Sequence, residues 1–243
     1  MPQRRAVSGI GPRGPMRRTS AGVGGIESPG DPESALDPER VIAVLEPLVT
    51  ESRRERLREV IARRISAVAV VIDAPYDPHN GAAIVRSCEA FGVQAVHVVE
   101  RHKTPFAVAR TVARSAEKWV DVTCHKDVAS LLEWSRDTGM PLIGAHPAGE
   151  LAPEALASMP RVAIVLGNER DGIRPEIARA CAACVHVPMR GFIESLNVSV
   201  TAALLVYAAT KDRPGDLDPD AQRRLYARGL VRSVAHAQEI LAR

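Results

Sequence analysis

The chain of 243 residues contains few aromatic side chains and few cysteines. Aromatic residues make up 3% of the composition, so a sheet interior must be built from Val, Leu, Ile and Ala, and an aromatic platform for stacking bases is not expected. Four cysteines are too few for a disulfide framework, which favours a reducing compartment, and we expect the cytoplasm. Cys181 and Cys184 form a C-x-x-C without a second Cys or His pair at zinc-finger spacing, so no metal is expected.

Long apolar runs are also missing. No stretch approaches the roughly 20 apolar residues needed to span a bilayer, and the N-terminus lacks the apolar run of a signal peptide, so we expect no membrane partner. Residues 1–36 begin with a segment rich in Gly, Pro, Ser and Arg, which indicates a disordered basic extension; a transit peptide is the alternative. The net charge of +3 favours an anionic partner only weakly.

The pattern of apolar residues predicts an α/β fold with a mostly parallel sheet and helices on both faces. Two helices are expected in 37–66, the first with Asp37 as N-cap and Pro38 at its first position. A domain over 67–213 follows, in which apolar strands alternate with helices, and residues 214–243 form a helical extension with one helix over 221–241. The expected strands are 67–73, 95–100, 120–123, 141–146, 161–167 and 184–189, and the expected helices are 80–91, 127–136, 175–181 and 197–210.

Three short segments each lie at a strand end or a helix start, where α/β sheets bind ligands. They are HNGAAIVR (79–86), VLGNERDGI (165–173) and PMRGFIESLNVSV (188–200). Taken singly, each has an ordinary structural interpretation: Asn80 and Asn197 as helix caps, Arg86 as a surface residue, and Glu169 as a solvated carboxylate in a turn. The dinucleotide fingerprint G-x-G-x-x-G is absent, which argues against a nucleotide-dependent oxidoreductase.

In order, spacing and residue type, the three segments resemble the motifs of the SpoU branch of the SPOUT RNA methyltransferases, most closely the TrmH type that acts on tRNA guanosine. The resemblance implies transfer of a methyl group from S-adenosylmethionine to a ribose 2′-hydroxyl without a metal, by a homodimer with a C-terminal trefoil knot. It implies guanosine 18 of the tRNA D-loop as the target. Ribosomal RNA, another tRNA position, and a non-catalytic RNA-binding protein of the same fold remain as alternatives.

The resemblance also assigns residues. The implied catalytic residues are Asn80, Arg86, Glu169, Ser195 and Asn197. The implied cofactor contacts are Ala145, Leu166, Gly167, Val187, Met189 and Leu196. Because Arg is a poor base, binding phosphate and stabilising the developing alkoxide is a safer role for Arg86 than accepting the proton.

Arginine is concentrated in the two helical extensions, and guanidinium groups bind phosphate well. The expected RNA contacts in the first extension are Arg53, Arg54 and Arg56, and those in the second are Arg224 and Arg228. A solvated helix face is the alternative interpretation of this pattern.

Overall fold

The protein is described from a computed structural model, which covers residues 36–100, 118–168 and 170–242. Its centre is a six-stranded sheet with the order β3-β2-β1-β5-β4-β6, and all five pairings between neighbouring strands are parallel. The expected α/β fold with a parallel sheet is thus confirmed. The strands are β1 Ile65–Asp73, β2 Val93–Val99, β3 Asp121–His125, β4 Leu142–Ala145, β5 Val162–Leu166 and β6 Ala183–Val185.

The central strands are buried on both faces, which is why their sequences are nearly continuous runs of Val, Ile, Leu and Ala. Every residue of β5 is buried, as are the last six residues of β1. One face packs against α3 (Pro78–Ala90), α6 (Ala155–Ser158) and α8 (Val198–Thr210). The other packs against α5 (Val128–Thr138) and α7 (Pro175–Ala180). Helices therefore cover both faces, as the sequence predicted.

The strand order creates a switch point between β1 and β5. From β1 the chain moves outward to β2 and β3 on one side, and the later strands β5, β4 and β6 occupy the other. Parallel strands present their carboxyl ends at one edge, and the crevice at such a switch point is where α/β sheets bind ligands. The segment after β1 contains the first motif, and the segment after β5 contains the second.

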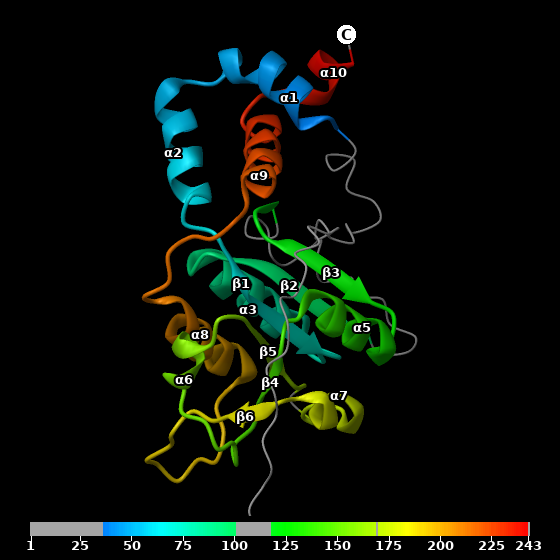
Figure 1. The fold of residues 1–243 in the computed structure, drawn as a ribbon, viewed down its shortest axis with the longest axis vertical. Helices are drawn as coiled ribbons and strands as arrows, with labels where there is room; N and C mark the ends of the chain where they lie inside the picture. The colour runs from blue at the N-terminus through cyan, green and yellow to red at the C-terminus, as the bar shows by residue number, and fades with distance from the viewer. Residues whose placement is uncertain (1–35, 101–117, 169, 243) are drawn as a thin grey trace, which may run out of the picture.

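Both helical extensions fold into one module with its own apolar core, at one end of the molecule in Figure 1. It consists of α1 (Pro38–Leu45), the short η1 (Glu46–Leu48), α2 (Glu51–Ile61), α9 (Pro219–Val231) and α10 (Ala237–Leu241). Leu45 and Leu230 are completely buried in it. Asp37 caps α1 by accepting a hydrogen bond from Glu39 N, and Pro38 opens the helix, as predicted.

The segment before α9 fastens this module to the sheet. Asp216 accepts hydrogen bonds from the backbone N–H groups of Ser66 and Ala67 at the start of β1, and its own N–H donates to Arg64 O at 3.0 Å. Gly215 passes so close to the end of α2 that a Cβ atom there would lie 2.0 Å from Ala62 O. Only glycine fits this crossing.

Two sequence predictions about helix ends are wrong. The cap of α3 is Asp77, whose carboxylate accepts from His79 N, so the helix starts at Pro78 and Asn80 lies inside its first turn. The helix expected over 221–241 is two helices, because His236 adopts a left-handed backbone conformation with φ of 56°. The break turns α10 back onto α1, where Arg40 Nη2 donates to Leu241 O at 2.6 Å.

Candidate active site

The first and third motifs meet through two asparagines at the N-terminal ends of α3 and α8. Asn197 Nδ2 donates to Asn80 Oδ1 at 3.1 Å. The other amide atom of Asn197, Oδ1, caps α8 by accepting from Ser199 N at 2.8 Å and Ser199 Oγ at 2.6 Å. The capping role that the sequence suggested for Asn197 is therefore present, and the same side chain also reaches across to α3.

The second motif is a tight loop closed by its own backbone and one buried side chain. Asn168 and Gly172 exchange two backbone hydrogen bonds, each of 3.1 Å, and Asn168 Oδ1 accepts from Arg170 N and Asp171 N. Gly172 has φ of 69°, and a Cβ on Gly167 would lie 2.3 Å from Gly172 C. The closure therefore requires both glycines. Glu169, the predicted catalytic acid, falls outside the described residues.

An acid at the end of β1 anchors this loop. Asp73 is completely buried, and its carboxylate accepts from Arg174 N at 2.7 Å and from Arg174 Nε at 2.6 Å. The bond joins the start of the segment that carries the first motif to the end of the loop that carries the second. Sequence reasoning missed this pair; the available signal was an Asp that ends an otherwise apolar buried strand.

A second contact joins the same two segments at the surface. The guanidinium carbon of Arg170 lies 3.7 Å from the ring centroid of Tyr76, and Arg170 Nη2 donates to Tyr76 Oη at 2.5 Å. Tyr76 is 51% exposed, in the segment between β1 and α3. Sequence analysis did not single out either residue.

The remaining predicted catalytic residues are exposed. Arg86 lies on α3 nearly two helical turns beyond Asn80, and Ser195 lies in the segment between β6 and α8. The structure thus brings Asn80 and Asn197 into contact and leaves Arg86 and Ser195 accessible on the elements that carry them.

The predicted cofactor contacts follow three neighbouring strands, β5, β4 and β6, at their carboxyl ends. The side chain of Leu166 is buried in the core, so only its backbone can reach a ligand. Ala145 and Val187 are half-buried and pack against the same core, while His146 N donates to Val185 O at 3.0 Å and so keeps the segment after β4 beside β6. Met189 and Leu196 are half-buried as well. Backbone polar groups and small apolar walls are what an adenosine site needs.

The arginines predicted to contact RNA differ in their surroundings. Three form ion pairs: Arg54 with Glu51, Arg56 with Glu59 at 2.8 Å, and Arg228 with Asp121 at 2.8 Å. Arg53 instead donates from Nε to Ser233 Oγ at 3.2 Å, and Arg224 is exposed on α9. The charge available to a phosphate is therefore greater at Arg53 and Arg224 than at the other three.

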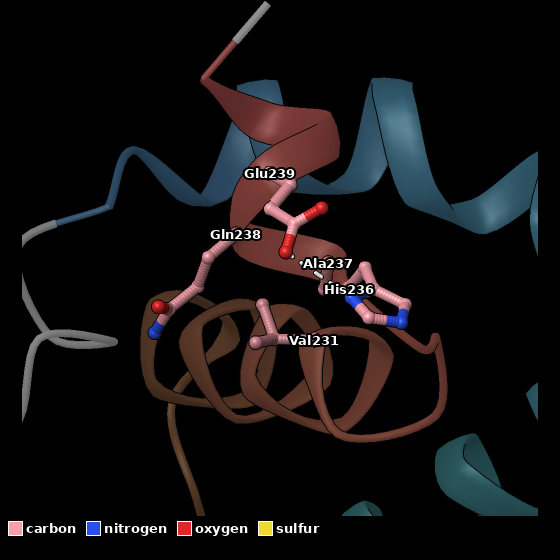
Figure 2. Close-up of a pocket in the computed structure, with 5 residues that line it drawn as sticks. All are labelled: Val231, His236, Ala237, Gln238 and Glu239. Atoms are coloured by element: carbon pink, nitrogen blue, oxygen red, sulfur yellow. Dashed lines mark hydrogen bonds and ion pairs between the residues drawn. The ribbon is translucent and has the colours of Figure 1, made fainter.

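A hollow on the helical module lies away from these motifs. It has a volume of about 310 Å³ and is lined by the end of α9 and by α10, and His236 in its lining contacts Glu239 at 3.1 Å (Figure 2). Figure 1 shows α10 at the opposite end of the molecule from β6. The hollow therefore takes no part in the site at the carboxyl edge of the sheet.

A buried histidine pair lies between the sheet and α5. His97 Nδ1 is 3.0 Å from His125 Nε2, and the His97 ring centroid is 3.7 Å from that of Trp134. Burial, and secondarily the neighbouring His125, lowers the pKa of His97 to about 3. Burial also lowers the pKa of His125. Both rings are therefore neutral at physiological pH.

The described residues contain neither a metal-binding cluster nor a membrane-spanning helix. Among them, no three His, Cys, Asp or Glu side chains cluster in a way that could hold a metal ion. In the same ranges, no helix has the length and apolar character required to cross a bilayer.

Comparison with known proteins gives a family. Residues 67–207 match the model of the SpoU rRNA Methylase family. The chain is 31% identical over 166 residues to the tRNA (guanosine(18)-2′-O)-methyltransferase of Escherichia coli K12, covering 67% of this chain and 71% of that protein. It is 33% identical over 169 residues to the 23S rRNA (guanosine-2′-O-)-methyltransferase RlmB of Xanthomonas axonopodis pv. citri, covering 69% and 67%.

A solved structure agrees with these sequence matches. The TrmH/SpoU tRNA modifying enzyme of A. aeolicus superposes with a TM-score of 0.67 at 25% identity, covering 76% of this chain and 98% of that one. The family match spans the sheet from β1 onward and all three motifs. On this evidence, the chain belongs to the SpoU methylase family.

Proposed function

We propose that the protein is an S-adenosylmethionine-dependent tRNA 2′-O-methyltransferase whose target is guanosine 18. The observation that carries the proposal is the hydrogen bond between Asn197 and Asn80, which joins the first and third motifs. A binding protein without catalysis has no need of such a junction. The similarity to the E. coli tRNA enzyme supports the choice of tRNA and of guanosine 18.

The residues at the ends of β4, β5 and β6 fit the cofactor. In this proposal, backbone groups of Leu166, Gly167 and Leu196 bind its polar atoms, and Ala145, Val187 and Met189 provide the apolar walls. When bound, the cofactor supplies an electrophilic methyl group on a sulfonium. The family model covers all of these positions.

The chemistry requires the oxygen of the ribose 2′-hydroxyl to bond to the methyl carbon while the carbon–sulfur bond breaks and leaves a neutral thioether, and the hydroxyl proton would pass to the adjoining phosphate or to water. Arg86 binds the adjoining phosphate and stabilises the developing negative charge on the 2′-oxygen, since its guanidinium remains protonated. Glu169, Ser195 and Asn197 orient the ribose, and Asn80 holds Asn197 in position through the bond of 3.1 Å. The exposure of Arg86 and Ser195 is consistent with contact to a substrate from outside.

The helical module, built from 37–66 and 214–243, grips the tRNA backbone in this proposal. Arg53 and Arg224, which form no ion pair among the described residues, supply the main phosphate contacts, and Arg54, Arg56 and Arg228 contribute less. The basic segment 1–36 precedes the module. Transfer RNA in the cytoplasm is the expected substrate, and the four free thiols agree with a reducing compartment.

The protein acts as a homodimer in this proposal, and its C-terminal part is a trefoil knot. Support for the dimer comes from an exposed apolar face on α8, formed by Val200, Leu204 and Tyr207, with Phe91 of α3 beside Tyr207 at a centroid distance of 5.6 Å. These residues recur at the spacing of one helix face, and a soluble monomer rarely exposes such a face. Support for the knot comes from the similarity to the TrmH/SpoU fold.

The decisive experiment compares two tRNA transcripts as acceptors of labelled methyl from S-adenosylmethionine. One is unmodified, and the other lacks only the 2′-hydroxyl at guanosine 18. We expect label in the first alone. Label in both would move the target to another nucleotide, and label in neither would contradict tRNA as the substrate.

The alternative of a ribosomal RNA substrate is favoured by one observation, the 33% identity to a 23S rRNA guanosine methyltransferase. The same assay with a 23S rRNA fragment as acceptor separates the two. Label in the rRNA fragment together with none in tRNA would favour this alternative.

A further inference from the structure

The pair Tyr76 and Arg170 stands at the surface where the first two motif segments meet. Tyr76 is half exposed and Arg170 is exposed. The guanidinium carbon of Arg170 lies 3.7 Å from the ring centroid of Tyr76, so each side chain covers part of the other. The guanidinium of Arg170 over the ring of Tyr76 places a cation and an aromatic face together at this surface. Nucleic-acid bases stack on surfaces of this kind.

Hydrogen bonds of the backbone hold the segments that carry Tyr76 and Arg170. Arg170 N is held by Asn168 Oδ1 at 2.9 Å, inside the closed loop of the second motif. Tyr76 follows Ala74, which adopts a left-handed backbone with φ of 48° and donates from its N–H to Val99 O at 2.9 Å. Asp73 and Arg174 join the same two segments underneath. The backbone bonds of both segments therefore hold Tyr76 and Arg170 in place before RNA binds.

The position relative to the catalytic groups is set by the chain itself. Arg170 directly follows Glu169, and Tyr76 lies four residues before Asn80 on the segment that leads into α3. A nucleotide whose ribose lies at Asn80 therefore has its base close to Tyr76, on the same segment. Among the other described aromatic residues, Trp134 contacts His97, and Trp119 and Tyr226 pack in the helical module. Phe91 and Tyr207 contact each other, and Phe192 is fully exposed in the third motif.

We infer that Tyr76 and Arg170 form the binding surface for the base of the target nucleotide, a purine that stacks on the guanidinium of Arg170 while Tyr76 holds that plane in place. The inference rests on the proposed function, because it identifies the occupant as the nucleotide that receives the methyl group. This surface does not select one base over another, since every base has a face that can stack. Its contribution is to hold the nucleotide out of the RNA stack with its 2′-hydroxyl in position.

The test uses two RNAs that differ only in the base. One is the intact tRNA transcript, and the other is abasic at the target nucleotide but retains its ribose 2′-hydroxyl and both phosphates. Tyr76→Ala and Arg170→Ala are compared with the wild type for kcat/KM of methyl transfer and for RNA affinity. Arg161→Ala is the matched control, because Arg161 is an exposed arginine at the opposite end of β5.

We expect each of the two variants to lower kcat/KM on intact tRNA by roughly 10- to 100-fold, the usual effect of removing a stacking partner. On the abasic RNA the same variants should match the wild type, and Tyr76→Phe, which keeps the ring, should retain most activity on both. The Arg161→Ala control should leave kcat/KM unchanged on both the intact and the abasic RNA. Binding of S-adenosylmethionine should be the same in all variants.

Equal losses on the intact and abasic RNAs would overturn the inference, because a purely structural role does not depend on the base. Failure of the proposed function gives a different result from failure of this inference. If the wild type transfers no methyl group to either RNA, the proposed function fails, and the affinity comparison still decides whether the pair stacks on a base. A wild type that binds both RNAs equally would overturn the stacking.

Discussion

Asn197 caps its own helix with one atom of its amide and donates to Asn80 with the other, across 117 residues of sequence. Because Oδ1 is used for the cap, Nδ2 is the atom that faces the first motif. The two functions of the side chain can therefore be separated by substitution. An aspartate keeps the cap and loses the donor.

Asn197→Asp should retain the stability of the wild type to within about 1 kcal/mol, because Asp is an equally good N-cap. Methyl transfer should fall at least about tenfold in kcat, since a carboxylate repels Asn80 Oδ1 instead of donating to it. Asn197→Ala should lose both, with about 1 kcal/mol of stability lost with the cap. Steady-state kinetics together with urea unfolding would check this, and full activity of Asn197→Asp would contradict the role of the bond.

The buried histidines predict a loss of stability in mild acid. The pKa of His97 is about 3 in the folded protein, whereas an unfolded His titrates near its ordinary value of 6.5. The unfolded chain therefore binds more protons in this window, so the stability is fully present above about pH 6.5 and falls as the pH drops toward 3. The expected slope is about 1 kcal/mol per pH unit below pH 6.5.

Urea unfolding between pH 7.5 and 5 measures this slope, in a range above the titration of ordinary carboxylates. His97→Phe keeps a ring against Trp134 and removes one titrating group, so its stability should fall less steeply over the same range. A wild-type stability that stays flat down to pH 5 would refute the expectation.

The ion pairs of the helical module predict unequal effects on RNA binding. Arg53→Ala and Arg224→Ala should each weaken tRNA binding and reduce the slope of log K against log salt by about 0.7 to 0.9, the effect of one lost phosphate contact. Arg56→Ala should reduce it less, because Glu59 already neutralises that guanidinium in the free protein. Filter binding over a series of salt concentrations provides the slopes. Equal reductions for all three variants would contradict this ranking.

The apolar face of α8 predicts a change of assembly on substitution. Leu204 is 43% exposed in the single chain, so Leu204→Glu should leave the fold intact while placing a charge in the proposed dimer contact. We expect a shift from dimer to monomer in sedimentation velocity. Glu133→Gln on α5, which covers the opposite face of the sheet, serves as the control. A wild type that sediments as a monomer would refute the dimer.

The central strands were predictable from sequence because burial on both faces requires them to consist of apolar residues. Val162–Leu166 is apolar throughout, and every residue in it is buried. The helix ends were less predictable where backbone conformation depends on packing. The last expected helix ends at Val231 and a new helix begins at Ala237, across a segment without Gly or Pro in which His236 adopts a left-handed backbone.

The site was predictable only in part for a related reason. Asn80 and Asn197 stand out in short motifs, but the pairing of Asp73 with Arg174 links residues 101 positions apart and leaves no local pattern. The same holds for Arg228 and Asp121, which are 107 positions apart. The number of arginines therefore overestimates the positive charge that the module presents to RNA, because the fold brings carboxylates beside several of them.

The crossing of Gly215 and Asp216 over the start of β1 has a consequence for the size of substrate. It holds the helical module at the amino end of a strand whose carboxyl end, at Asp73, supports the motif loops. Nine residues of extended chain separate the two ends, which is about 30 Å. An RNA that touches both regions of one chain must be at least that long, so an oligonucleotide shorter than this span that carries the target guanosine would reach the loops without contacting the helical module.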